Sequence, residues 1–269
     1  MTSTPTPIDP ASRPHSTLPY PPIYKDAQFV ALSDWDGTIT SMDSNDFLTD
    51  NLGFGLEKRR ALNIEVLAGR MTFRDAFREM LQSVAANGHS FQECVEVLKK
   101  NIKLDPGFKD FYRWCKEHDV PVVIVSSGME PTLRGVLSTL LGDDEASEID
   151  VICNSVVVED GGKKWEIQYR HPDSGYGHDK SWAILPYREL AHRPTLFFFG
   201  DGVSDMSAAK HADLLFVKIK PNGENDLANY CRENKIKHVE FTSFHDAQAI
   251  VADVVEGKRT VGEVLEAGQ

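Results

Sequence analysis

The stretch VALSDWDGTITSMD, residues 30–43, runs from apolar side chains directly into two carboxylates, Asp34 and Asp36. Together with the preceding AQF it has the length and apolarity of a buried strand, and the polar residues mark the carboxyl end of that strand. Like charges in such a place repel each other and lose water, and both effects raise the pKa of a carboxyl group. A bound cation removes this repulsion, so the pattern favours a cation site at the end of the strand.

The composition is that of a soluble globular protein, because 41% of the 269 residues are apolar. There are 41 acidic and 29 basic residues, which give a net charge of −12. This acidic balance argues against nucleic acid or an anionic membrane as the main partner. The four cysteines form no CxxC pair or Cys/His cluster, so we expect reduced thiols and a cytoplasmic location. We also expect no membrane span and no signal peptide, since no apolar stretch is long enough.

Three segments of different character divide the chain. Residues 1–25 contain seven prolines and few large apolar side chains, which predicts a flexible tail. Beyond this tail, short apolar runs alternate with helical patterns, except in residues 42–102, where helical patterns follow one another behind capping residues such as Thr72. We expect an α/β fold in which residues 26–41 and 103–256 form a doubly wound, mostly parallel sheet, with a helical insertion after the first strand.

Three of the predicted strands end in polar sequences: DWDGT at residues 34–38, SSG at residues 126–128 and DGVSD at residues 201–205. Ligands of a doubly wound sheet bind outside the carboxyl ends of its strands. If these strands are neighbours, four carboxylates meet in one pocket: Asp34, Asp36, Asp201 and Asp205. Converging carboxylates favour Mg²⁺, a hard cation that takes oxygen ligands and often shares them with a substrate phosphate.

Other polar residues suit a phosphate group. Ser126, Ser127 and Gly128 follow a strand and precede a helical pattern, where hydroxyl and backbone N–H groups donate to anions. Lys180, in the sequence GHDKS, would supply a positive charge to the transferring group. Spacing alone does not choose between Lys180 and the two residues before it, and most lysines are surface groups.

The four elements DWDGT, VIVSSG, GHDKS and GDGVSD, in this order, resemble the four motifs of the haloacid dehalogenase-type (HAD-like) phosphatase superfamily. The resemblance covers about residues 27–220 and implies a three-layer core with a Rossmann-like parallel sheet, capped by the helices of residues 42–102. It implies hydrolysis of a phosphomonoester through an aspartyl-phosphate intermediate, with Mg²⁺ as the cofactor. A phosphotransferase or mutase would use the same motifs, whereas a non-enzymatic scaffold would not need clustered aspartates.

The resemblance also implies a role for each motif residue. Asp34 would be the nucleophile, and Asp36 would protonate the leaving oxygen and then activate water. Ser126 and Lys180 would hold the phosphoryl group. The implied ligands of Mg²⁺ are the carboxylate of Asp34, the backbone carbonyl of Asp36, the carboxylate of Asp201, and Asp205 as a further ligand or as support.

The predicted cap resembles that of the phosphoserine phosphatase-like subgroup. Asp43 stands where this subgroup has a glutamate, and Arg78, in MTFRDAFR, stands at the position that contacts a substrate carboxylate there. Because Asp43 is shorter than glutamate and Ser127 replaces a glycine of the second motif, we expect a sugar or polyol phosphate as substrate. Phosphoserine and 2,3-diketo-5-methylthiopentyl-1-phosphate are the alternatives. The expected partner in each case is a small phosphorylated metabolite.

Overall fold

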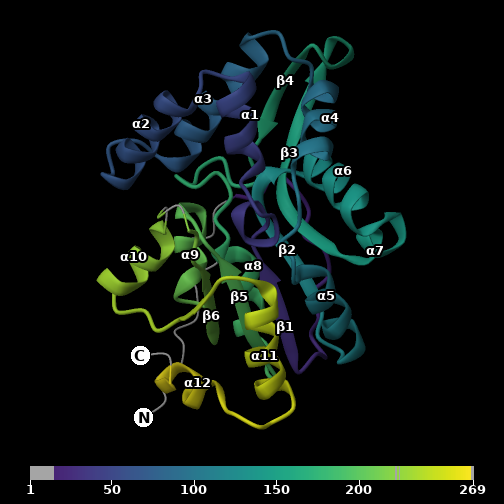
Figure 1. Cartoon of the computed structure of the whole chain (residues 1–269), viewed down its shortest axis with the longest axis vertical. Helices are drawn as coiled ribbons and strands as arrows, with labels where there is room; N and C mark the ends of the chain where they lie inside the picture. The colour runs from purple at the N-terminus through teal and green to yellow at the C-terminus, as the bar shows by residue number, and fades with distance from the viewer. Residues whose placement is uncertain (1–14, 222, 224, 268–269) are drawn as a thin grey trace.

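A computed structural model describes residues 15–221, 223 and 225–267 of the chain. Its centre is one sheet of seven strands in the order β4-β3-β2-β1-β5-β6-β7 (Figure 1). Neighbouring strands are parallel, except that β4 runs antiparallel to β3. The strands have the following bounds: β1 Phe29–Ser33, β2 Val122–Met129, β3 Asp150–Glu159, β4 Lys164–Gln168, β5 Thr195–Gly200, β6 Leu214–Lys218 and β7 Val239–Phe241. Since β2, β1 and β5 are neighbours, the three polar strand ends do meet at one edge of the sheet.

Helices cover both faces of the sheet, which confirms the predicted three-layer α/β fold. Along β1, Val30 and Leu32 pack with α8, α9 and α10, while Ala31 belongs to the opposite face, which α5, α6 and α11 cover. Successive side chains of a strand point to opposite faces, so an uninterrupted apolar run suits a strand that is buried on both. The helices have the following bounds: α1 Ser44–Leu52, α2 Leu56–Leu67, α3 Phe73–Ala86, α4 Phe91–Asn101, α5 Phe108–Glu117, α6 Glu130–Leu141, α7 Asp143–Glu148, α8 Ser181–Arg188, α9 Met206–Ala209, α10 Asp226–Glu233, α11 Phe244–Val255 and α12 Val261–Ala267.

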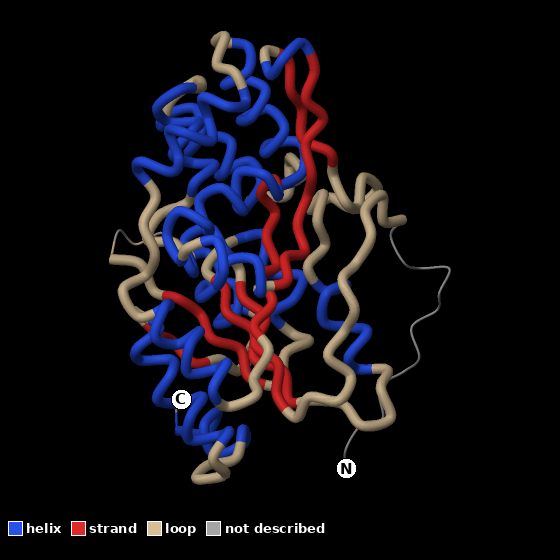
Figure 2. The backbone as a smooth tube through the Cα atoms, turned by 90° about the vertical axis from the view of Figure 1, so that its right-hand side faces the viewer, coloured by secondary structure: helices blue, strands red, loops and turns tan. Residues whose placement is uncertain are grey.

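Five of these helices lie between β1 and β2 in the sequence, and the first four, α1 to α4, form a helical insertion beyond the carboxyl ends of the strands (Figure 1). Helix α3 begins where the predicted cap Thr72 places it, and the side chains of Thr72 and Ser90, before α3 and α4, each accept the backbone N–H three residues further on. The β3–β4 hairpin extends beyond the sheet toward this insertion (Figure 2). There Trp165 Nε1 donates to the carbonyl of His89 at 3.0 Å.

The segment before β1 packs against the core. Thr17 Oγ1 donates to the carbonyl of Tyr169 at 2.7 Å, and Tyr24 Oη donates to Asp150 at 2.6 Å. The flexible tail expected over residues 1–25 is therefore corrected for its second part, which long-range hydrogen bonds hold in place; residues 1–14 lie outside the described residues. At the other end of the chain α12 buries Val264, so the core continues past the boundary expected at residue 256.

Two further expectations concern the state of the thiols and the presence of a membrane span. All four cysteines are buried and none forms a disulfide. Within the described residues, the helices are too short or too polar to span a membrane.

Candidate active site

The turn after β1 brings both predicted carboxylates to one cavity. Residues Trp35–Ile39 form a single wide helical turn, closed by a hydrogen bond from Thr40 N to Trp35 O at 3.0 Å. Asp34 caps this turn, because its Oδ1 accepts the N–H of Trp35 at 2.7 Å. Asp36 lies inside the turn with a non-helical backbone (ψ 118°). Both aspartates are buried, and both line the cavity between the sheet and the helical insertion.

Gly37 permits an unusually close approach of this turn to charged groups. Its φ is +76°, in the left-handed region that favours glycine. A Cβ at this position would lie 2.8 Å from Asp201 Oδ2 and 2.8 Å from Lys220 Nζ. The glycine of the DGT sequence is thus required both by the backbone angle and by the neighbouring side chains.

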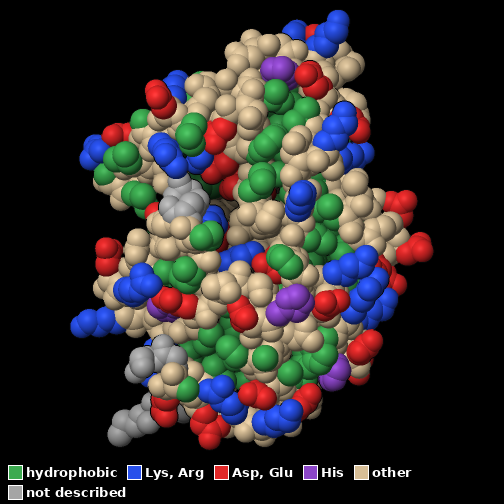
Figure 3. Space-filling view, viewed as in Figure 1, with side chains coloured by type: hydrophobic (Ala, Val, Ile, Leu, Met, Phe, Trp, Pro, Cys, Tyr) green, Lys and Arg blue, Asp and Glu red, His purple; other side chains and the backbone are tan. Residues whose placement is uncertain are grey.

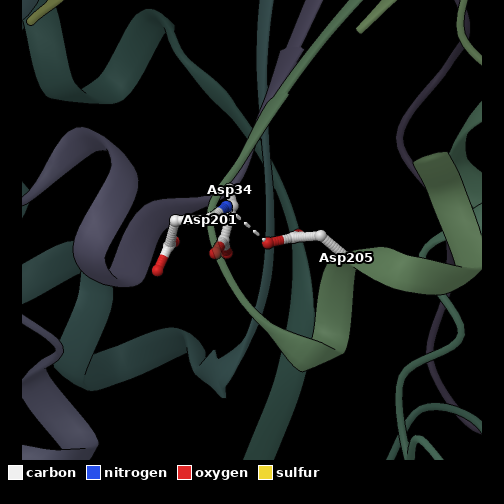
Figure 4. Close-up of side chains that lie close together, drawn as sticks. All are labelled: Asp34, Asp201 and Asp205. Carbon is white, nitrogen blue, oxygen red and sulfur yellow. Dashed lines mark hydrogen bonds between the residues drawn. The ribbon is translucent and has the colours of Figure 1, made fainter. Parts of the chain in front are cut away.

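Three buried carboxylates converge at the ends of β1 and β5 (Figure 4). Asp34, Asp201 and Asp205 each offer a carboxylate oxygen, and these oxygens lie within 4.8 Å of one another. Burial, and then the charge of Asp205, raise the pKa of Asp34 well above its usual range. An ionised Asp34 therefore needs positive charge close by, and a set of buried oxygen donors fits a hard divalent cation.

Lys180 supplies part of that positive charge. It is fully buried, and its Nζ lies 2.6 Å from Asp34 Oδ1 and 2.8 Å from Asp205 Oδ1. Burial lowers the pKa of a lysine, but Asp205 and Asp34 outweigh this and raise the pKa of Lys180. The other oxygen of Asp205 accepts the backbone N–H groups of Asp201 and Gly202, at 3.0 and 3.1 Å. Asp205 therefore has both oxygens engaged within the protein.

Asp36 has a different environment from Asp34. Its Oδ1 accepts the N–H and the hydroxyl of Ser44, at 2.8 and 2.5 Å, and its Oδ2 accepts Asn45 Nδ2 at 2.8 Å. Burial, and then the charge of Asp43, raise the pKa of Asp36 to about 8. Burial thus favours the protonated form of this carboxyl group, which is the form that a general acid needs. Because Ser44 and Asn45 begin α1, the helical insertion itself orients this group.

The second motif lies beside Asp36. Ser127 and Gly128 line the cavity, and a Cβ on Gly128 would lie 3.3 Å from Asp36 Oδ2. Ser126 is fully buried, and its Oγ accepts the N–H of Gly128 at 2.9 Å. His178 Nδ1 lies 2.6 Å from the carbonyl oxygen of Ser126, which ties the second motif to the loop before Lys180.

The surface is hollowed between the helical insertion and the core, with acidic and basic side chains around the opening (Figure 3). On the insertion side, Asp43 caps α1 by accepting the N–H groups of the second and third residues after it. Arg59 of α2 lies 2.7 Å from Asp46 and 2.7 Å from Asp50, so its charge is paired. The rest of the lining on the insertion side is apolar and comes from α2 and α3: Leu62, Val66, Phe73, Phe77 and Met80.

The structure brings Asp43 to the cavity but places Arg78 elsewhere. Arg78 Nη1 lies 3.4 Å from Asp75, and its Nε lies 3.7 Å from Glu166 of β4. The guanidinium also lies 5.0 Å from the ring centroid of Tyr169. The side of α3 that faces the cavity carries apolar residues instead: Phe73, Ala76, Phe77 and Met80. The expected contact of Arg78 with a substrate carboxylate is not supported, because Arg78 lies on the other side of α3, which packs against the β3–β4 hairpin.

Two lysines of the site escape the motif analysis. Lys220, in the loop after β6, lines the cavity and forms an ion pair with Asp201. Lys218, at the end of β6, is buried, and its Nζ donates to the carbonyl of Thr38 and to Asp105, each at 2.7 Å. Lys218 thus supports the turn after β1 from behind. The only sequence signal for either residue is its place at the carboxyl end of an apolar strand.

Comparison with known proteins identifies the family. The model of the haloacid dehalogenase-like hydrolases matches residues 31–210. The chain belongs to this family. The HAD-like phosphatase predicted from the four motifs is therefore confirmed, and the motif residues above lie within the matched range.

Two relatives and one solved structure resemble this HAD-like chain over most of its length. Pdp3-interacting factor 1 of Schizosaccharomyces pombe is 49% identical over 221 residues, which is 81% of this chain and 93% of that protein. Polyol phosphate phosphatase PYP1 of Saccharomyces cerevisiae is 44% identical over 245 residues, 88% of this chain and 98% of that protein. A phosphoserine phosphatase with a phospho-aspartyl intermediate analogue covers 77% of this chain and 98% of its own, with a TM-score of 0.54. At 17% identity, that last likeness shows the fold alone.

Proposed function

We propose that this HAD-like phosphatase is a cytoplasmic, Mg²⁺-dependent enzyme that hydrolyses a small phosphorylated polyol or sugar through an aspartyl-phosphate intermediate. One observation carries the proposal: two carboxyl groups in one turn have different environments. Asp34 contacts the ammonium group of Lys180, whereas Asp36 accepts hydrogen bonds from the neutral groups of Ser44 and Asn45 and has a pKa of about 8. Cleavage of a phosphomonoester needs an ionised nucleophile, which Lys180 and a bound cation would favour at Asp34, beside an acid that keeps its proton.

The proposed reaction has two steps. Lys180 and the N–H of Trp35 both engage Oδ1 of Asp34, so we assign the attack on phosphorus to Oδ2. As the bond between Asp34 and phosphorus forms, the bond to the ester oxygen breaks, and the proton of Asp36 passes to the leaving alcohol. Asp36, now a carboxylate, takes a proton from a water molecule that attacks the phosphorus. This step releases phosphate and regenerates Asp34.

The metal would be held by Asp34, Asp201 and the backbone carbonyl of Asp36. We assign Asp205 to a supporting role, because Lys180 and two backbone N–H groups already engage its oxygens. When bound, Mg²⁺ would offset the repulsion between the buried carboxylates and an incoming phosphate. The convergence of three carboxylates within 4.8 Å supports this assignment.

The insertion side of the cavity favours hydroxyl groups over a carboxylate. Asp43 and Asp46 line this side and would accept hydrogen bonds from a polyol or sugar. A substrate carboxylate, as in phosphoserine, would meet these acidic groups, while Arg59 is already paired with Asp46 and Asp50. The name of the 44% identical relative, a polyol phosphate phosphatase, agrees with this preference.

A second candidate substrate is a methylthio-sugar phosphate. The specific observation in its favour is the apolar wall that α2 and α3 present to the cavity, which would bury an alkyl or thioether group: Leu62, Val66, Phe73, Phe77 and Met80.

We further propose that residues 42–102 act as a cap that closes over the bound substrate and excludes water. Asn63 Nδ2 of α2 lies 3.4 Å from Asp226 Oδ2, at the start of core helix α10, so this contact joins the two sides of the cavity. The cap also carries Ser44 and Asn45, which hold the general acid. Closure would therefore complete the site only when the substrate is enclosed.

The test is a release assay for inorganic phosphate with a panel of polyol, sugar, amino-acid and methylthio-sugar phosphates, with and without Mg²⁺. We expect the highest kcat/KM with a polyol or sugar phosphate, and no turnover after chelation or in Asp34→Asn. A preference for phosphoserine would overturn the substrate assignment. Full activity without a divalent cation would overturn the mechanism, and transfer to an added alcohol with little phosphate release would indicate a phosphotransferase.

A further inference from the structure

The segment before β1 is a strap, which we define as residues 16–24. Arg170 holds it, because its Nη1 donates to the carbonyls of Leu18 and Pro19, at 3.0 and 2.9 Å. The guanidinium also lies 4.7 Å from the ring centroid of Tyr20. The strap forms no helix or strand whose hydrogen bonds would fix it, so one buried arginine sets its position.

Tyr20 connects the strap to the loop that leads to Lys180. Its Oη lies 2.6 Å from Nε2 of His171, and the other ring nitrogen, Nδ1, accepts the backbone N–H of Asp179 at 3.0 Å. Because Nδ1 accepts a hydrogen bond, a neutral ring carries its proton on Nε2 and donates it to Tyr20. Burial lowers the pKa of His171 to about 4, so the ring is neutral at physiological pH.

Asp179, whose backbone N–H donates to His171, directly precedes Lys180, the cation of the active site. Asp179 Oδ1 accepts the N–H and the hydroxyl of Ser181, at 3.1 and 2.6 Å, where α8 begins. Lys180 lies between these two residues, and its Nζ contacts Asp34 at 2.6 Å. A chain of contacts therefore runs from Tyr20, through one imidazole ring and one peptide group, to the ammonium group beside the proposed nucleophile.

We propose that Tyr20 is a positioning residue of this enzyme: through His171 it fixes the backbone at Asp179 and thereby aims the ammonium group of Lys180 at the transferring phosphoryl group. The role rests on the proposed phosphoryl transfer, but it belongs to a residue outside the four motifs and outside the range 31–210 that the family model matches. A strap that only covered apolar surface would not need a hydrogen bond to a buried imidazole.

Tyr20→Phe in the full chain tests this role, because it removes one hydroxyl and keeps the ring beside Arg170. Tyr24→Phe is the matched control: it makes the same change in the same strap, but its hydroxyl bonds Asp150 instead of the Lys180 loop. With an aryl phosphate and Mg²⁺, we expect kcat to fall about fivefold in Tyr20→Phe, the size of one lost hydrogen bond. In Tyr24→Phe we expect kcat to change less than about twofold, and the two variants to lose similar amounts of thermal stability.

A spectroscopic measurement separates positioning from a merely structural effect. We expect the ¹⁵N shift of the Lys180 ammonium group and the Nε2–H signal of His171 to change in Tyr20→Phe and to stay in place in Tyr24→Phe. Inhibition by orthovanadate, which mimics the transferring group, should weaken about fivefold in Tyr20→Phe alone. Unchanged Lys180 signals in Tyr20→Phe, or equal kcat losses in both variants, would overturn the proposal. If the wild type releases no phosphate, the proposed function fails, and the Lys180 signals still decide whether Tyr20 positions this group.

Discussion

Replacement of Lys180 by methionine is the sharpest test of the electrostatics of the site. The ammonium group is fully buried between two carboxylates, at 2.6 Å from Asp34 and 2.8 Å from Asp205. Methionine keeps most of the side-chain volume and removes only the charge. The variant therefore leaves two buried carboxylates without the cation that faces them, while the packing around them changes little.

The expected loss of stability follows from burial. Removal of one partner from a buried ion pair destabilises a protein by about 3–5 kcal/mol, because the remaining charge stays desolvated. The free energy of unfolding that Lys180→Met loses relative to the wild type, which we call the deficit, also depends on pH. Burial and Asp205 already raise the pKa of Asp34, and without Lys180 this carboxyl binds a proton still more readily in the folded state. A folded state that binds the extra proton gains stability as pH falls, so the deficit of the variant is largest at pH 8 and shrinks toward pH 5.

Equilibrium unfolding in urea, followed by tryptophan fluorescence and circular dichroism in the presence of a chelator, measures this loss. The control is Lys58→Met, which makes the same exchange in an exposed ion pair with Glu79, where the side chains are 53% and 41% exposed. We expect a loss below about 1 kcal/mol for the control. A loss for Lys180→Met that equals the control, or one that grows as the pH falls, would refute the reasoning.

Four other outcomes are expected. Asp36→Asn should keep the circular dichroism spectrum of the wild type and lower kcat at least about 100-fold. The kcat of the wild type should decline above about pH 8, where Asp36 loses its proton, and a kcat that is independent of pH from 6 to 10 would contradict this role. Lys220→Met should bind Mg²⁺ more tightly in calorimetry, because the substitution frees a carboxylate oxygen of Asp201. Weaker binding would show that Lys220 contributes to the binding of the metal. Mg²⁺ added after chelation should raise the melting temperature, because it offsets the repulsion around Asp34; an unchanged value would separate metal binding from stability. Arg78→Ala should leave KM within about twofold, since the guanidinium faces β4, and a tenfold rise in KM would place it at the substrate after all.

The convergence of Asp34, Asp36 and Asp201 follows from the sequence because topology places it. In a parallel sheet the carboxyl ends of neighbouring strands meet, and polar residues directly after an apolar run need no further information to be brought together. Lys180 is harder to assign, since it begins a helix far along the chain and its two preceding residues are also polar. The structure shows what distinguishes it: a fully buried ammonium group that contacts carboxylates from the turns after β1 and β5.

The residues that sequence reasoning misplaces or omits depend on contacts between distant segments. The exposed fraction and direction of Arg78 are set by Glu166 and Tyr169, which the β3–β4 hairpin brings to α3. The proline-rich composition around Tyr20 predicts a flexible tail, and it carries no sign of the buried imidazole that the tyrosine contacts 151 positions further on. Composition shows whether a segment can form a core by itself, but it does not show whether the segment packs against a core that other segments form.

The loop before Lys180 belongs to the core and contacts both the strap and the helical insertion. On the insertion side, the N–H of Arg74 donates to the carbonyl of Gly175 at 2.8 Å, and its Nη1 donates to the carbonyl of Pro172 at 2.6 Å. On the core side, His171 ties the same loop to Tyr20 of the strap. If closure of the insertion moves α3, the loop transmits that displacement toward Lys180 unless its other end is held. Under the proposed closure, a loop anchored by the strap would convert motion of the cap into a defined placement of one ammonium group, whereas a loose loop would absorb that motion.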